Sequence, residues 1–149
     1  GYGKSGWAMI DTETRQPQNI LAIRDGEIER YIEKDKECPI EGLSRVKMGK
    51  EAKLARTIDT YYCDVDVNGH TNSIKYIEHI LDLFDIDHYR KFRIRRFDIA
   101  YVAESYCGDK LNFYTEERDD DTVCVRVTKT NAETVDAEVV RCMLKFEKI

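Results

Sequence analysis

The stretch that decides the fold runs from Tyr62 to Tyr76 and reads YCDVDVNGHTNSIKY. The segment that enters it, 57–62, is β-branched or aromatic at every position except Asp59, which is typical of a strand. The last residues of the stretch 62–76 begin a helix. Asn72 or Ser73 can cap it, and apolar residues then recur at three- and four-residue intervals: Ile74, Ile77, Ile80, Leu81 and Phe84. Carboxylates, an amide and an imidazole therefore lie on one short turn between a strand and a helix.

The same stretch begins like a calcium loop, with suitable residues at the first, third, fifth and sixth positions: Asp64, Asp66, Asn68 and Gly69. The twelfth position should be a bidentate Glu, and here it is Lys75. An EF-hand also needs an entering helix where this chain has a strand pattern. We therefore expect no metal site here.

The polar cluster lies at the N-terminus of the predicted helix. Unpaired backbone N–H groups and the positive end of the helix dipole favour a developing negative charge there, such as the oxyanion of an attacked carbonyl. Gly69 has no Cβ, so a carbonyl can approach its N–H closely. We predict that Gly69 and Asn72 bind the oxyanion and position the substrate.

At these residues the chain resembles the acyl-ACP thioesterases of plants and bacteria, hotdog-fold enzymes that release fatty acids from acyl carrier protein. That family carries an Asp-x-Asn-x-His-x-Asn-Asn-x-x-Tyr signature. Ser73 stands where the family usually has the second Asn of its pair, and serine is also a good helix cap. The other signature positions match in type and spacing: Asp66, Asn68, His70, Asn72 and Tyr76.

Supporting matches flank the signature. The run 7–11, followed by Thr14-Arg15, resembles the last strand of the family's first hotdog domain, and 101–104 resembles its Tyr-x-x-Glu strand. The family has two hotdog domains in tandem, whereas this chain has room for one and the tail of another. The resemblance thus implies three parts: a tail strand of a preceding hotdog domain at 1–15, a connecting segment at 16–52 and a hotdog thioesterase domain at 53–149.

Alternation of apolar residues predicts an antiparallel sheet with one buried face, seen in Val123, Val125, Val127 and in Val140, Cys142, Leu144, Phe146. We expect strands at about 5–11, 54–64, 94–106, 110–118, 122–130 and 135–148, and a helix at about 72–85. Gly108-Asp109 and 119–121 supply turns. One long helix wrapped by an antiparallel β-sheet is the α+β hotdog fold.

Composition limits the class of protein. A length of 149 residues with 42% hydrophobic content suits one domain of ordinary size with a real core. A net charge of -5 argues against nucleic acid as a partner. No apolar run approaches the ~20 residues that span a bilayer, so we expect no membrane partner. A strand pattern so close to Gly1 suggests a chain cut from something longer.

Five cysteines are present, and their number is odd. No pair has C-x-x-C spacing, which argues against a disulfide framework or a zinc site. Reduced thiols in a cytoplasm fit better, so we expect a cytoplasmic protein. The residues are Cys38, Cys63, Cys107, Cys124 and Cys142.

Asp66 shares its turn with Asn68 and His70, and this grouping favours catalysis over a simple turn-capping role. His79 and His88 lie on or just beyond the helix without a comparable polar cluster in the sequence around them. We expect these two histidines to be surface or packing residues.

The resemblance adds Glu104 as a catalytic residue, which would otherwise be an outward-facing charge on a strand. In plant members of the family the next position is often Cys, and here it is Ser105. Cys107 could share the strand face of Ser105, but a thiol among aromatic and apolar neighbours is more often a buried packing residue. We therefore favour a mechanism without cysteine.

The resemblance implies hydrolysis of the thioester of fatty acyl carrier protein to a free fatty acid, with no cofactor. In the expected mechanism the thioester carbonyl lies against Gly69. Asp66 and Glu104 orient and deprotonate water, or Asp66 attacks directly. His70 and Asn68 position the thioester and shuttle protons. The sequence leaves both routes open.

The implied partner is acyl carrier protein with a phosphopantetheine-linked acyl chain. Carrier proteins are acidic, and five cations crowd into seven residues that could dock one: Arg90, Lys91, Arg93, Arg95 and Arg96. A solvated link between helix and strand is the other interpretation. Because a single hotdog sheet usually packs against a second, we also expect a homo-oligomer or pairing with a second hotdog domain.

Two other functions stay open at this point. One is a non-catalytic hotdog module that binds acyl chains or shapes an oligomer. Release of free thiol from acyl-ACP or acyl-CoA separates it from an enzyme. The other is a hotdog dehydratase, which also uses His and a carboxylate but matches the Asp-x-Asn-x-His order less well.

Overall fold

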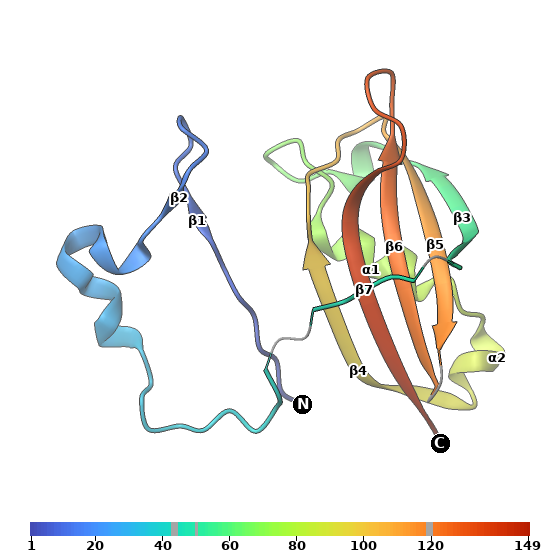
Figure 1. Cartoon of the computed structure of the whole chain (residues 1–149), viewed down its shortest axis with the longest axis horizontal. Helices are drawn as coiled ribbons and strands as arrows, with labels where there is room; N and C mark the ends of the chain where they lie inside the picture. Colours follow the sequence, from blue (N-terminus) through green and yellow to red (C-terminus); the bar gives the residue numbers. More distant parts are fainter. Residues whose placement is uncertain (43–44, 50, 119–120) are drawn as a thin grey trace. The chain divides into compact units, whose positions relative to one another are not determined.

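In the computed structural model the chain forms two compact units, Gly1–Ser44 and Arg45–Ile149 (Figure 1). The structure describes residues 1–42, 45–49, 51–118 and 121–149. The segment 45–49, expected to be part of the connection, thus belongs to the larger unit. That residues 1–15 end a preceding hotdog domain stays a prediction.

The smaller unit holds a two-stranded hairpin of β1 (Met9–Ile10) and β2 (Pro17–Gln18), followed by the 3₁₀ segment η1 (Ile20–Tyr31). The strand expected at 5–11 is therefore reduced to two residues. The reason is physical: a two-stranded hairpin has little face to bury and is marginal in isolation. The expected connecting segment, in turn, contains η1, in which no residue is buried.

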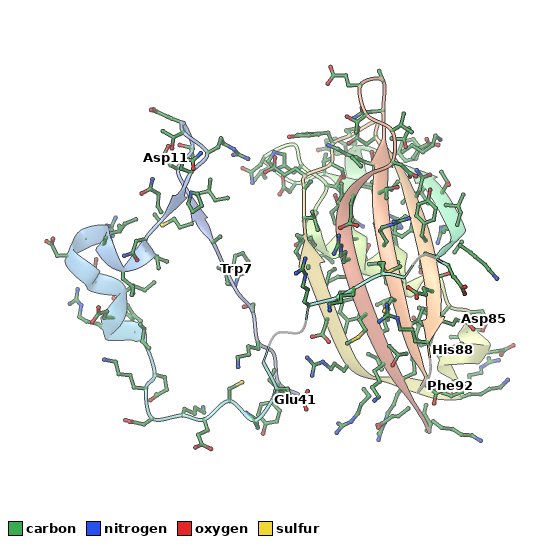
Figure 2. All side chains as sticks on the ribbon, viewed as in Figure 1. Trp7, Asp11, Glu41, Asp85, His88 and Phe92 are labelled. Atoms are coloured by element: carbon green, nitrogen blue, oxygen red, sulfur yellow. The ribbon has the colours of Figure 1, made fainter. Side chains whose placement is uncertain are left out.

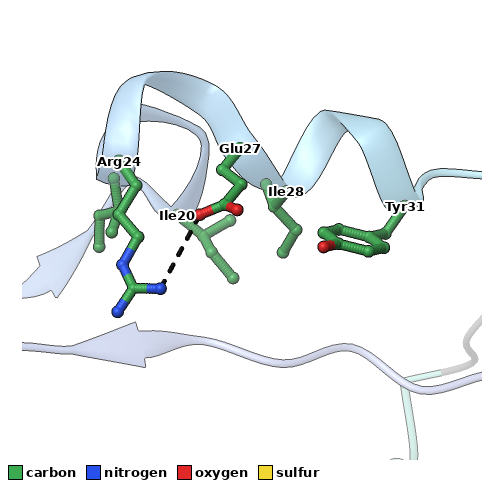
Figure 3. Close-up of a pocket in the computed structure, with 6 residues that line it drawn as sticks. Ile20, Arg24, Glu27, Ile28 and Tyr31 are labelled. Carbon is green, nitrogen blue, oxygen red and sulfur yellow. Dashed lines mark ion pairs between the residues drawn. The ribbon is translucent and has the colours of Figure 1, made fainter.

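η1 is broken in its middle, where Arg24, Asp25 and Gly26 all have positive φ. Its apolar residues line a groove of about 420 Å³ together with Arg24 and Glu27, which form an ion pair at 3.8 Å (Figure 3). None of the predicted site residues lies in this groove.

The larger unit is built on a five-stranded antiparallel sheet with strand order β3-β5-β6-β7-β4. Its strands are β3 (Lys53–Asp59), β4 (Phe92–Tyr101), β5 (Lys110–Arg118), β6 (Thr122–Thr130) and β7 (Ala137–Lys148). The strands expected at 110–118 and 122–130 are confirmed. The turn expected at 119–121 falls largely on residues outside the described part, and Gly108 makes its turn with a positive φ.

Between β3 and β4 the chain forms η2 (Tyr62–Asp64), α1 (Ser73–Leu81) and α2 (Ile86–Tyr89). The strand expected to reach residue 64 ends at Asp59, because the Asp64 carboxylate accepts the Tyr61 N–H at 2.8 Å and winds the chain into η2. The helix expected to reach residue 85 ends at Leu81, and a separate short helix follows. Asp85 caps α2 by accepting the His88 N–H at 2.7 Å.

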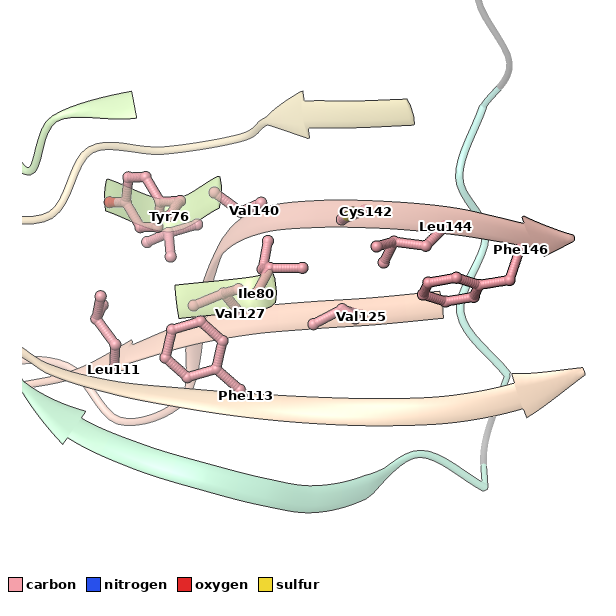
Figure 4. Packing of buried hydrophobic residues seen from close by; sticks show 11 residues of the cluster. Tyr76, Ile80, Leu111, Phe113, Val125, Val127, Val140, Cys142, Leu144 and Phe146 are labelled. Atoms are coloured by element: carbon pink, nitrogen blue, oxygen red, sulfur yellow. The ribbon is translucent and has the colours of Figure 1, made fainter. Parts of the chain in front are cut away.

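The core lies between α1 and one face of the sheet (Figures 1 and 4). Ile80 of α1 and Phe113 of β5 are both fully buried, and each such side chain stabilises the fold by roughly 1.5–3 kcal/mol. The alternating residues expected in β7 all belong to this core, which confirms the predicted buried face and the α+β arrangement: Val140, Cys142, Leu144 and Phe146.

The segment 45–49 lies across the other face of the sheet (Figure 1). Arg118 donates to the Lys47 carbonyl, and the Gly49 N–H donates to Glu116 Oε2 at 2.5 Å. A Cβ at Gly49 would lie 2.2 Å from Glu116 Oε1, so a larger residue here would displace the Glu116 carboxylate from its present position. Val46 is buried here, and both faces of the sheet are therefore covered at least in part.

Candidate active site

The turn at 66–70 is closed by hydrogen bonds to Asp66. Its carboxylate Oδ1 accepts the N–H groups of Asn68 at 2.8 Å and His70 at 3.3 Å, and its carbonyl accepts the Gly69 N–H at 3.0 Å. Gly69 has a φ of 78°, a conformation that glycine adopts without strain. Asp66 Oδ2 accepts no hydrogen bond within the described part of the chain, so one carboxylate oxygen builds the turn and the other is available.

The turn is joined to α1 from both sides. The Asn72 N–H donates to the Asp64 carbonyl at 2.8 Å, and Asn72 Oδ1 accepts the Ile74 N–H at 2.9 Å as the expected helix cap. Asp64 Oδ1 also lies 3.5 Å from His79 Nε2 on α1. His79 therefore has an acidic neighbour that the sequence around it did not reveal. These contacts fix the turn to the start of the helix.

Glu104 does not lie on a strand, contrary to expectation. The N–H groups of Val102 and Ala103 both donate to the Val139 carbonyl, at 2.8 and 3.3 Å, and this shared acceptor ends the β4–β7 ladder. β4 accordingly stops at Tyr101 rather than near residue 106. Beyond it the chain leaves the sheet and reaches the turn that carries His70.

His70 and Glu104 meet although they are far apart in the sequence. His70 Nε2 lies 3.7 Å from Glu104 Oε2, and both side chains are partly exposed, at 34% and 43%. The Tyr106 hydroxyl donates to the same Glu104 oxygen at 3.1 Å, and the Tyr106 ring packs edge-on against His70. Lys129 donates to the Glu104 carbonyl at 2.7 Å. An imidazole and a carboxylate thus lie side by side where solvent can reach them.

Ser105 is buried and cannot serve as a nucleophile in this arrangement. It is 1% exposed, and its Oγ bonds the Tyr76 hydroxyl at 2.5 Å and donates to Thr71 Oγ1 at 2.7 Å. Burial raises the pKa of Tyr76, an effect that its bonds to Ser105 and Thr71 partly oppose. Cys107 lies in a turn and is exposed, so the expectation that it packs in the interior, or shares a strand face, is wrong.

The backbone amides at this site are mostly engaged. The Gly69 N–H already has the Asp66 carbonyl as its acceptor, and the Ile74 and Lys75 N–H groups bond to Asn72. The Ser73 N–H has no acceptor among the residues that the structure describes. Oxyanion binding at Gly69 stays a prediction, and Ser73 is a further amide that the sequence offered only as a cap.

The basic run after α2 is largely matched by carboxylates. Glu147 of β7 lies 2.5 Å from Arg93 and 3.6 Å from Arg95. Asp87 pairs with Arg90 at 2.7 Å, and Asp98 with Arg96 at 2.6 Å. Five cations thus face three carboxylates, which leaves a smaller positive surplus than the sequence suggested.

His88 lies at the other end of the larger unit, beside Phe92 (Figure 2). Its ring stacks on Phe92 with centroids 4.9 Å apart and packs edge-on against Phe146 at 4.5 Å. This is the packing role expected for it.

Within the described residues no helix is both long enough and apolar enough to cross a bilayer.

A family model, that of the acyl-ACP thioesterase C-terminal domain, matches residues 47–148. An acyl-ACP thioesterase from Bacteroides thetaiotaomicron is 45% identical with a TM-score of 0.80, over 93% of this chain and 53% of that one. The 12:0-ACP thioesterase from Umbellularia californica is 20% identical with a TM-score of 0.73, over 94% of this chain and 53% of that one. No curated protein matches the chain.

A more distant structure supports the fold alone. The hexameric thioesterase from Yersinia pestis is 10% identical with a TM-score of 0.55, over 68% of this chain and 91% of that one. The chain spans about half the length of the Bacteroides and Umbellularia proteins. Because the family model covers most of the chain, this protein belongs to the acyl-ACP thioesterase family and carries its C-terminal hotdog domain.

Proposed function

We propose that this domain hydrolyses the thioester of a fatty acyl chain carried on acyl carrier protein. The observation that carries the proposal is the meeting of His70 and Glu104, at 3.7 Å, beside a turn whose Asp66 keeps one carboxylate oxygen available. Family membership supports the reaction class, and the partly exposed pair supports access for a substrate. Together they favour chemistry over passive binding.

In the proposed reaction the acyl carbonyl lies at the N-terminus of α1. Water, deprotonated by Asp66 or Glu104, or the Asp66 carboxylate itself, attacks the carbonyl carbon. The negative charge that moves to the carbonyl oxygen is stabilised by the positive end of the helix and by an amide, for which Ser73 and Gly69 are the candidates. The C–S bond then breaks.

Protons must balance in this sequence. In the water route, the proton that Glu104 takes from water passes through His70, whose Nε2 lies 3.7 Å away, to the leaving thiolate. In the direct route, the thiolate takes a proton held between His70 and Glu104, and the water that later hydrolyses the anhydride returns one to them. Asn68 is exposed on the same turn and is proposed to bind the substrate amide or carbonyl. In the direct route, water later hydrolyses the Asp66 anhydride and frees the fatty acid.

Release of free thiol from acyl-ACP tests the function. The chain should release thiol, and Asp66→Asn should abolish release without lowering the unfolding temperature. Glu117→Gln is the matched control, since Glu117 is an exposed carboxylate near His88 and Phe92, at the other end of the larger unit. A folded chain that binds the acyl substrate but releases no thiol would make it an acyl-binding module instead.

We also propose that the basic run docks the carrier protein. Lys91 is exposed and carries none of the ion pairs described above, and Arg95 is 70% exposed at the longer distance from Glu147. Lys91→Glu should slow the acyl-ACP reaction several-fold at low salt but not the acyl-CoA reaction. Added salt should reduce the difference between the variant and the wild-type rates with acyl-ACP. Lys53→Glu, the same charge change on β3, should have no such effect; equal slowing of both substrates would refute docking.

A second hotdog surface is the proposed structural partner. Large apolar side chains around the turn are solvent-exposed, and such patches mark interaction surfaces: Tyr62, Val67, Ile74, Tyr101 and Val102. A second copy or a second hotdog domain would cover them. Light scattering should detect self-association of this chain, and a monomer at high concentration would contradict it. We also propose a cytoplasmic location, because an odd number of cysteines without C-x-x-C spacing fits reduced thiols.

A further inference from the structure

Three buried hydroxyl groups form a chain directly behind the site. Ser105 Oγ lies 2.5 Å from the Tyr76 hydroxyl and donates to Thr71 Oγ1 at 2.7 Å. These residues are 1%, 3% and 7% exposed. They come from three separate elements: the segment after β4, helix α1 and the end of the turn. Through Ser105, the chain of hydroxyls joins the segment after β4 to the turn and helix α1, which are distant from it in the sequence.

Its members lie next to the residues proposed to react. Thr71 directly follows His70, and Ser105 directly follows Glu104. The Thr71 N–H also donates to the Ser105 carbonyl at 2.8 Å, and the backbones of His70 and Tyr106 form an isolated antiparallel β-bridge. The hydroxyl chain thus clamps the two backbones at the point where the imidazole and the carboxylate emerge.

The physical reason that such a clamp matters is the tolerance of the chemistry. Reactive groups must be held to within about 0.5 Å of their productive geometry, and a displacement of about 1 Å costs roughly 10²-fold in rate. The His70 and Glu104 side chains are themselves 34% and 43% exposed, so surrounding protein covers them only in part. Buried hydroxyls need their partners, so each one resists a shift of the other two.

We propose that Ser105, Thr71 and Tyr76 are positioning residues that hold His70 and Glu104 in register. The proposal deepens the hydrolase function and rests on it. It assigns Ser105 a structural bond in place of a nucleophilic role, because its oxygen is enclosed by two hydroxyl partners. A thiol at this position has a longer bond and makes weaker hydrogen bonds, so it should weaken the clamp.

Substitutions of these hydroxyls test the proposal. Ser105→Ala, Ser105→Cys and Thr71→Val should each lower kcat for thioester hydrolysis about 10- to 100-fold with KM within about twofold. Thr71→Ser, which keeps the hydroxyl, should recover kcat to within about threefold. An increase in kcat for Ser105→Cys would instead mean that this position supplies the nucleophile, and an unchanged kcat for Ser105→Ala would overturn the proposal.

Thr128→Val is the matched control. Thr128 is 2% exposed, and its hydroxyl donates to Asp136 at 2.6 Å and not to a member of the hydroxyl chain. It should lower the unfolding temperature about as much as Thr71→Val but leave kcat unchanged. Equal loss of kcat in both variants would mean that buried hydroxyls act only through stability, and the positioning role would be wrong.

Two further measurements separate positioning from the function itself. In a Glu104→Gln background, Ser105→Ala should cost less than about threefold, because the carboxylate that it positions is gone. Without substrate, the NMR signals of the His70 ring should move in Ser105→Ala but not in Thr128→Val. If the wild-type chain releases no thiol, the hydrolase function fails while the NMR comparison still decides the clamp; unmoved His70 signals refute it.

Discussion

The two segments that form the site are held in opposite ways. The turn, 64–72, is closed by bonds among its own residues, with Asp66 accepting three of its N–H groups. The Glu104 segment, 102–109, has partners that are distant in the sequence: Val139 and Lys129 on the sheet, and Thr71 at the end of the turn. One segment carries its geometry in its own sequence, and the other receives it from the sheet.

This difference separates two kinds of substitution. A change in the turn that keeps its hydrogen bonds should affect chemistry and leave the fold intact. A change around the Glu104 segment should act through position, since its neighbours determine where the carboxylate lies.

Asp66→Asn should cost the most, about 10³-fold or more in kcat, because it removes the base or nucleophile. The amide oxygen of Asn can still accept the N–H groups of Asn68 and His70, so the unfolding temperature should stay within about 2 °C. Asp66→Ala should lose the same activity and also about 1 kcal/mol of stability. Thiol release and thermal unfolding measure both, and retained turnover in Asp66→Asn would remove Asp66 from the mechanism.

Glu104→Gln should reduce kcat about 10²-fold, since it removes a carboxylate from the proton pathway to His70. Its stability should change by less than about 0.5 kcal/mol, because Glu104 is at the surface. Tyr106→Phe keeps the ring against His70 and removes the hydroxyl that donates to Glu104. This variant should lose only about 3- to 10-fold. A larger loss for Tyr106→Phe than for Glu104→Gln would reverse their proposed roles.

Lys129→Met should have a smaller effect, about fivefold in kcat, with about 1–2 kcal/mol of lost stability. Lys129 is largely buried, and its ammonium donates to the Glu104 carbonyl and lies 3.9 Å from Asp109. Denaturant unfolding and steady-state kinetics give both values. Lys129→Arg keeps the charge and serves as the control. If Lys129→Met keeps full stability, the Glu104 segment is held by other contacts than those described.

Cys107→Ala should change kcat by less than about twofold, because the mechanism uses no thiol. Burial raises the pKa of the Cys124 and Cys142 thiols, so few thiolates form there near neutral pH. A maleimide should therefore label the three exposed cysteines in the folded protein: Cys38, Cys63 and Cys107. If labelling inactivates the protein and Cys107→Ala prevents this inactivation, Cys107 lies near the active site without taking part in the reaction. If Cys107→Ala is itself inactive, the mechanism uses a cysteine.

Much of the fold and part of the site follow from the sequence. The alternation in β6 and β7, the cap at Asn72 and the closed turn at Asp66 were all predictable. Each depends on residues within a few positions of one another, through side-chain periodicity or short-range hydrogen bonds. Such interactions are encoded locally, so the sequence alone determines them.

The ion pairs of the basic run and the position of the Glu104 segment depend on how the strands pair. β4 pairs with β7 so that Arg93 lies opposite Glu147, which neutralises part of the basic run. Where that ladder ends, at Tyr101, the chain is free to carry Glu104 to His70 and to bury Ser105 between Thr71 and Tyr76. These contacts join distant residues, and no local pattern encodes them. Only the tertiary structure, through the pairing of whole strands, sets which of those residues meet.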